Sequence, residues 1–95
     1  MKNILLYLIA GSRGGETRQR ILMSLSVHPK NAHQLTKELM LDYKTVQHHL
    51  RVLEKHRVLA TINKGAYGAA YYIPPEIEAI WAEFGKKYLN AKKQR

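Results

Sequence analysis

The chain has 95 residues, and 45% of them are hydrophobic, which fits one folded domain and excludes a disordered protein. It contains no cysteine, which excludes disulfide bonds, thiol catalysis and thiolate metal sites. The 16 Lys and Arg residues outnumber the 7 Asp and Glu residues, and the formal net charge of +9 favours a polyanionic partner such as nucleic acid. We therefore expect residues 1–95 to form a single basic domain.

Residues 2–10 are apolar almost all round, which predicts a helix buried on several sides, in a core or at a subunit interface. The segment faintly resembles a signal peptide, but its apolar run is far too short to span a bilayer. We therefore expect a cytoplasmic protein without a membrane partner. Three glycines within residues 11–15 end this first helix.

Two short helices follow each other closely in the middle of the chain. After a helix at about 16–26 and a turn, Asn31 is a good N-cap for a helix that ends near Met40. Asp42 caps the next helix, at about 43–56. Because only two or three residues separate these two helices, they are typical of a helix-turn-helix.

A β-hairpin is expected directly after the helix-turn-helix. Residues 58–63 and 69–73 have the pattern of strands, and the segment between them is a glycine-bearing turn. A hairpin in this position is a wing. Pro75 then begins a last helix at about 75–90. The predicted fold is mainly α with a small β-hairpin, a winged helix-turn-helix of about five helices plus a two-stranded wing.

The helix at 43–56 is predicted to read DNA in the major groove. At 100° per residue its apolar side chains fall on one arc and a basic, hydrogen-bonding set falls on the opposite arc. We expect Lys44 and Arg51 to approach phosphates or guanine edges, and Gln47 to pair with adenine. His49 points toward the edge of the core, where a structural hydrogen bond is expected. The candidate DNA-contacting residues on this helix are Tyr43, Lys44, Thr45, Gln47, His48 and Arg51.

Two further segments are candidates for DNA contact. Lys64 and Tyr67 stand at the tip of the wing, where they would reach a phosphate or the minor groove, although an ordinary polar hairpin turn would have the same composition. Asn31 and Gln34, with His33 between them, begin the preceding helix and could contact a phosphate at its N-terminus.

The segments 1–15 and 75–95 flank the helix-turn-helix and are predicted to form dimerisation helices. Both are unusually apolar, and a core built from residues 16–73 would leave part of them uncovered. The alternative is that the last helix folds back wholly onto its own domain. The predicted dimer-interface residues are Ile4, Leu5, Leu8, Ile77, Ile80, Trp81, Phe84 and Tyr88.

Other classes of function lack a motif in this sequence. There is no phosphate-binding loop, nucleophile elbow or paired carboxylate, so we expect no enzyme activity and no cofactor. His48 and His49 are adjacent on a helix and point about 100° apart, so they cannot chelate one metal ion together, and we expect no metal site. The alternative function is that of an RNA-binding or protein-interaction winged helix.

Residues 16–73 resemble the ArsR-type winged-helix regulators, particularly the short archaeal members. The resemblance is carried by the stretch from Leu35 to Leu59, most specifically by His49-Leu50-x2-Leu53. It implies a homodimer that regulates transcription by binding a pseudo-palindromic operator on double-stranded DNA. Many relatives sense metals through a cysteine pair or through Asp and His on the last helix. This chain has no cysteine and no histidine in residues 75–90, so the resemblance does not extend to metal sensing.

Overall fold

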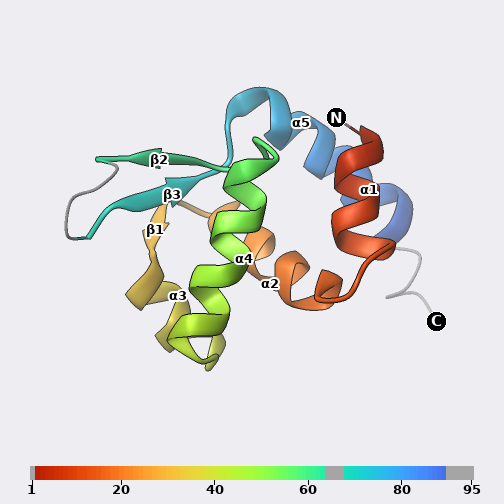
Figure 1. The fold of residues 1–95 in the computed structure, drawn as a ribbon. Helices are drawn as coiled ribbons and strands as arrows, with labels where there is room; N and C mark the ends of the chain where they lie inside the picture. Colours follow the sequence, from red (N-terminus) through yellow and green to blue (C-terminus); the bar gives the residue numbers. More distant parts are fainter. Residues whose placement is uncertain (1, 64–67, 90–95) are drawn as a thin grey trace.

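The computed structural model describes residues 2–63 and 68–89, and the side chains of all of these except Tyr88 and Leu89. Its elements in chain order (Figure 1) are α1 (Lys2–Ala10), α2 (Gly15–Leu25), β1 (Lys30–Asn31), α3 (Ala32–Leu39), α4 (Tyr43–Lys55), β2 (Ala60–Ile62), β3 (Ala70–Tyr72), α5 (Pro75–Phe84) and the π-helical turn η1 (Gly85–Leu89). This arrangement confirms the predicted winged helix-turn-helix.

The helix-turn-helix of α3 and α4 forms where the capping residues predict it. The Asn31 side chain accepts a hydrogen bond from the backbone N–H of Gln34, and the Gln34 side chain accepts one from the backbone N–H of Asn31, both at 2.8 Å. Met40 ends α3 in the left-handed conformation with a φ of 55°. Asp42 then caps α4 by accepting a hydrogen bond from the backbone N–H of Thr45.

The wing is part of a three-stranded antiparallel sheet with the strand order β1-β3-β2. Thr61 of β2 and Lys30 of β1 both pair with Tyr71 of β3. The sequence predicts only the two hairpin strands; of the two residues of β1, Lys30 falls in the expected turn and Asn31 at the expected N-cap. A strand of two residues shows no alternation of apolar and polar side chains, so only its pairing with a distant segment reveals it.

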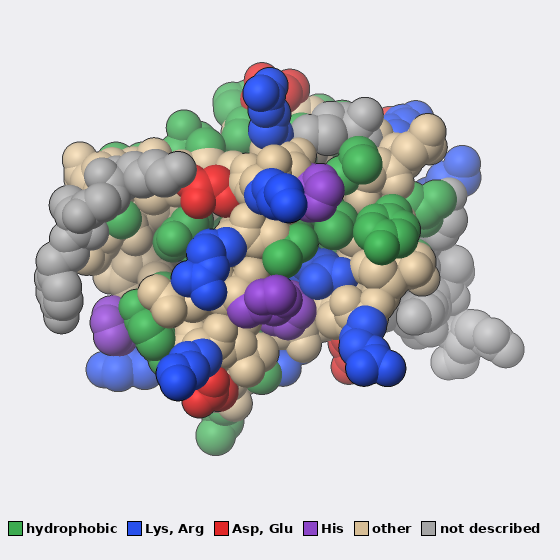
Figure 2. Space-filling view, in the orientation of Figure 1, with side chains coloured by type: hydrophobic (Ala, Val, Ile, Leu, Met, Phe, Trp, Pro, Cys, Tyr) green, Lys and Arg blue, Asp and Glu red, His purple; other side chains and the backbone are tan. Residues whose placement is uncertain are grey.

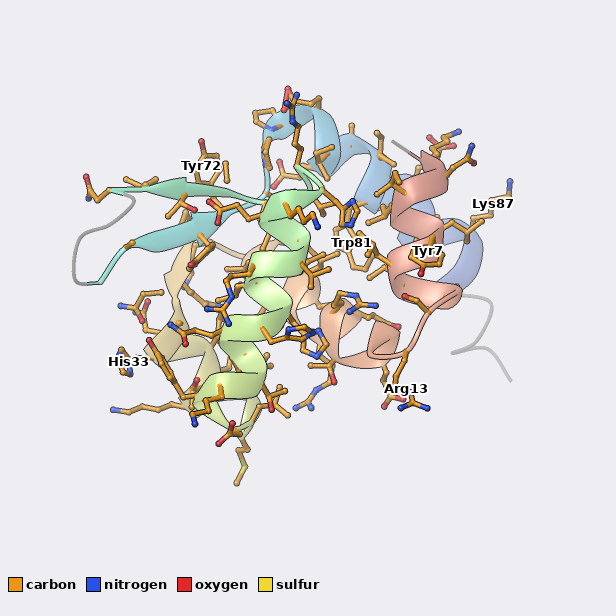
Figure 3. All side chains as sticks on the ribbon, in the orientation of Figure 1. Tyr7, Arg13, His33, Tyr72, Trp81 and Lys87 are labelled. Atoms are coloured by element: carbon orange, nitrogen blue, oxygen red, sulfur yellow. The ribbon has the colours of Figure 1, made fainter. Side chains whose placement is uncertain are left out.

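The two flanking helices complete the core of the same chain. Leu5 and Leu8 of α1 are buried with Ile77, Trp81 and Phe84 of α5 in one hydrophobic cluster that also includes the helix-turn-helix. Figure 3 shows Trp81 pointing from α5 into the space beside α4. These five side chains, which the sequence predicts at a dimer interface, thus pack into the core of their own chain. They are buried because α1 and α5 together close the small helix-turn-helix core.

Helix α1 and helix α5 lie side by side (Figure 1), and Lys2 Nζ forms an exposed ion pair of 3.3 Å with Glu83. The last helix keeps α-helical geometry only to Phe84 and continues as a π-helical turn from Gly85, whereas the sequence predicts one helix at about 75–90. No helix in the described parts of the chain is long and apolar enough to cross a membrane.

Candidate nucleic-acid interface

Helix α4 presents a basic face to solvent. Val46, Leu50 and Leu53 are fully buried against the core, so the wheel position of each inward residue is as predicted. The opposite arc is exposed, and Figure 2 shows Lys, Arg and His side chains gathered over α4, which faces the viewer. The exposed side chains of this arc are Lys44, His48, Arg51 and Lys55. An exposed arc without an acidic residue beside a buried arc is the pattern of a helix that meets a polyanion.

Three polar side chains connect α3 and α4 at one end of this face. The rings of His33 and Tyr43 stack with their centroids 4.7 Å apart. Gln47 Nε2 donates a 3.2 Å hydrogen bond to the Tyr43 hydroxyl. His33 lies on the outer side of α3 in Figure 3. Tyr43 and Gln47, both predicted to contact DNA, thus hold each other in place on the surface, while Thr45 is half-buried beside them.

Asn31 and Gln34, which were predicted to contact a phosphate, form the capping box that begins α3. Their side-chain oxygens accept the two hydrogen bonds of the capping box, so these oxygens are occupied in starting α3. The side-chain N–H2 group of Gln34, which is exposed, keeps its donors for a ligand.

The wing is oriented by a contact between β2 and α4. Thr61 Oγ1 donates a 2.5 Å hydrogen bond to Glu54 on the last turns of α4. Tyr71 of β3 is half-buried against the core, and burial followed by the nearby Glu54 carboxylate raises the pKa of its hydroxyl. The hairpin therefore leaves α4 in a fixed direction. The predicted wing-tip residues Lys64 and Tyr67 lie outside the described residues.

A buried arginine, which is not among the residues predicted from the sequence, supports α4. Arg18 of α2 is 4% exposed, and its Nη1 donates to Nδ1 of His49 at 3.2 Å. Its Nε donates to the carbonyl oxygen of Leu8, and its Nη2 donates to Ser12 Oγ and to the carbonyl oxygen of Arg13. One side chain thus joins α1, the α1–α2 loop and α4, and the structural hydrogen bond expected for His49 is confirmed.

The wheel of α2 contains the signal that would have identified Arg18. It precedes Ile21, Leu22 and Leu25 by three, four and seven positions, so it lies on the buried face of the helix. Burial, then the Arg18 charge and then His48 lower the pKa of His49, so its imidazole is neutral and Nδ1 can accept the hydrogen bond.

Lys30 is a second buried cation. Its Nζ donates to the carbonyl oxygen and to Oγ of Ser24, at 2.8 and 2.7 Å, and forms a 2.9 Å ion pair with Glu38. The hydrogen bond from Lys30 is the main reason that the pKa of Glu38 lies below its ordinary value. Lys30 therefore links β1 to α2 and α3, and its buried ammonium group does not contribute to the surface that a ligand would contact.

Among residues 2–63 and 68–89, no three His, Cys, Asp or Glu side chains come close enough together to hold a metal ion.

Known proteins share both the helix-turn-helix segment and the fold of this chain. Residues 15–61, from α2 into β2, match the family model described as "Bacterial regulatory protein, arsR family". No curated protein matches the chain.

Several solved structures share the fold. The antimony-specific transcriptional repressor AntR superposes with a TM-score of 0.75 at 19% identity, covering 98% of this chain and 80% of its own. HlyU from Vibrio cholerae N16961 gives 0.71 at 22% identity, covering 93% and 92%. BldR from Sulfolobus solfataricus gives 0.73 at 15% identity, covering 98% and 67%. The segment from α2 into β2 therefore matches the helix-turn-helix domain of the arsR family, and the whole chain has the fold of these solved structures.

Proposed function

We propose that this chain is a homodimeric transcription regulator that binds a specific double-stranded DNA sequence, with α4 in the major groove and the β2–β3 hairpin as the wing. The exposed basic arc of α4 is the observation that carries the proposal. Lys44, His48 and Arg51 project from the second helix of a helix-turn-helix, whose opposite arc is buried. The matched family, which consists of regulatory proteins and not of enzymes, supports the same function.

Each side chain on this arc has a distinct role in the proposal. Lys44 and Arg51 bind phosphates or guanine edges, and Gln47 reads an adenine after releasing the Tyr43 hydroxyl. Thr45 contacts a thymine methyl group or a phosphate, and His48 donates to a phosphate. Lys64 and Tyr67 of the wing reach the backbone or the minor groove.

The test is DNA binding by variants of the α4 face. The operator is first identified by mapping the bound sites across a genome, and affinity is then measured by fluorescence anisotropy. Lys44→Ala and Arg51→Ala should each weaken binding by roughly 5- to 150-fold if the lost contact is to a base edge, which corresponds to about 1–3 kcal/mol. The matched control is Lys86→Ala, which removes one exposed positive charge from η1.

Two results would contradict the assignment of α4. One is unchanged affinity in the Lys44→Ala, Arg51→Ala double variant. The other is preferential binding of a structured RNA over duplex DNA in competition at one salt concentration, which would identify an RNA-binding winged helix. Thermal unfolding of every variant should match the unmodified protein, because these side chains are exposed.

The proposed dimer uses the apolar surface that α1 and α5 leave exposed. Leu6 is 37% exposed and Tyr7 is 57% exposed on α1, and Ile4 is 37% exposed on a different side of the same helix from Leu6. Leu6 and Ile80 also line a cavity of about 130 Å³ between α1 and α5. Apolar side chains gathered on one surface usually mark an interface. A two-fold dimer through these helices would set two copies of α4 about 34 Å apart, the spacing of successive major grooves.

Light scattering tests the dimer. The unmodified protein should have twice the 11.0 kDa mass of one chain, and Leu6→Glu should have the mass of a monomer. Val27→Glu is the matched control, because Val27 is a 74% exposed apolar side chain outside α1 and α5. A monomeric unmodified protein would overturn the dimer. Trp81→Glu is unsuitable, because Trp81 is 6% exposed and the variant would disrupt the core of the subunit itself.

A further inference from the structure

A basic hollow lies between the α1–α2 loop and the N-terminal half of α4. No acidic residue lines it. Arg13, Lys44 and His48 are exposed around it, and Figure 3 shows Arg13 on the loop beyond the end of α1. The residues that line the hollow are Arg13, Gly14, Arg18, Lys44, Thr45, His48 and His49.

Arg18 contributes a buried positive charge to this hollow. Its guanidinium donates to four acceptors, the carbonyl oxygens of Leu8 and Arg13, Ser12 Oγ and the imidazole of His49. All four acceptors are uncharged, so they satisfy N–H groups without neutralising the charge. Buried charges in proteins are normally paired with an opposite charge. An anion in the hollow would supply that charge, and four bonds leave one of the five guanidinium N–H groups for it, on Nη1.

Gly14 lets the α1–α2 loop pass close to the guanidinium of Arg18. Its φ is 86°, and a Cβ there would lie 2.7 Å from Cε1 of His49 and 3.1 Å from Nη1 of Arg18. A residue with a Cβ would collide with these two side chains, which both line the hollow. The Nη2 bonds to Ser12 and Arg13 also fix this loop against α2, so the backbone of Arg13 is held beside α4.

We propose that this hollow binds a phosphate of the DNA backbone and that Arg13 is its principal exposed ligand. The inference rests on the proposed function, because Lys44 and His48 line the hollow and also belong to the arc of α4 that faces the duplex. DNA that lies along this arc brings its backbone to the α1–α2 loop. Backbone contacts of this kind fix the orientation of a reading helix in the groove. Arg13 and Lys44 bind the phosphate directly, and the buried guanidinium of Arg18 stabilises its negative charge.

Salt dependence of binding tests this inference without knowledge of the operator, since a phosphate contact acts on every sequence. Affinity for one duplex of arbitrary sequence is measured at several salt concentrations. Log affinity falls with log salt, and Arg13→Ala should make this slope less steep by about 0.9 for each bound subunit. Arg13→Lys should retain the slope, and so should the control Lys86→Ala. The fold of Arg13→Ala is preserved, since Arg18 bonds to the backbone carbonyl of residue 13.

The outcomes separate this inference from the proposed function. If Arg13→Ala keeps the affinity and the slope while Lys44→Ala and Arg51→Ala weaken binding, the phosphate site is overturned and the regulator stands. If the unmodified protein binds no duplex DNA, both are overturned. If inorganic phosphate raises the melting temperature of the unmodified protein but not of Arg13→Ala, and DNA binding is equal, the hollow takes a free anion and the proposal is also overturned.

Discussion

The basic side chains of this protein form two groups that differ in burial. Lys44, Arg51 and Lys55 lie on the outer arc of α4 and are exposed. Arg18 and Lys30 are 4% and 7% exposed and each connects several elements of the fold. The difference shows that a net charge of +9 overstates the charge available to a ligand. The exposed group should determine most of the DNA affinity. In the buried group, Lys30 is paired with Glu38 and serves the fold alone, whereas Arg18 holds the fold together and adds its charge to the proposed phosphate site.

The largest effect on stability is expected from Arg18→Met. The substitution leaves the carbonyl oxygens of Leu8 and Arg13 without their charged donor and removes the link to His49. We expect the free energy of unfolding to fall by about 3 kcal/mol, measured by urea denaturation, because buried acceptors lose their hydrogen bonds. Arg18→Lys keeps the charge but not the planar set of five donors. Its free energy of unfolding should therefore lie between those of the unmodified protein and Arg18→Met. A loss under about 1 kcal/mol in Arg18→Met would break the comparison between buried and exposed cations.

Lys30→Met should have the next largest effect. It removes the buried donor to the carbonyl oxygen and to Oγ of Ser24, and we expect a loss of about 1–2 kcal/mol in urea denaturation. Glu38→Gln should cost less than Lys30→Met, because the Glu38 side chain is 45% exposed and solvent screens its charge. Equal losses in the two variants would show that the ion pair, and not the bond to Ser24, holds β1 in place.

The stability should also depend on pH through the two partners of these cations. The pKa of His49 is lowered on folding, so the unfolded chain binds the proton more tightly. The contribution of the neutral His49 to the free energy of unfolding is therefore complete above pH 6.5, the ordinary pKa of histidine, and is lost as the pH falls below this value. Glu38, whose pKa is also lowered, adds a loss below its ordinary value of 4.5.

Melting temperatures measured on both sides of pH 6.5 test the contribution of His49. His49→Gln keeps an acceptor for Arg18 but does not titrate. As the pH is lowered, the melting temperature of this variant should therefore fall less steeply than that of the unmodified protein. An unchanged slope in His49→Gln would mean that the protonated imidazole is tolerated beside Arg18.

The smallest effect on stability is expected from Lys55→Ala. Lys55 is exposed on the last turn of α4, and the free energy of unfolding should change by less than about 0.5 kcal/mol. The same variant should weaken DNA binding if Lys55 belongs to the contacting face. Denaturation and anisotropy on one preparation measure both quantities. If Lys55→Ala lost more stability than Lys30→Met, the exposed cations would matter more for the fold than the buried cations, which contradicts the comparison.

Local patterns in the sequence were sufficient to predict the helices and the two arcs of α4. Capping by Asn31 and Asp42 is decided within three residues, and the inward positions of Val46, Leu50 and Leu53 follow from the helical repeat. The wheel also placed His49 at the edge of the core. These features depend on neighbours in the chain, so they can be read without knowing the fold.

The tertiary structure decided which elements meet. Arg18 joins α2 to His49, 31 positions further along the chain, and β1 becomes a strand only by pairing with β3. Helices α1 and α5 close the core, although their composition fits a subunit interface equally well. The sequence determined each helix and its faces because hydrogen bonds and side-chain periodicity are local. Packing between distant segments determined the support of α4 and the basic hollow, because burial depends on the whole chain.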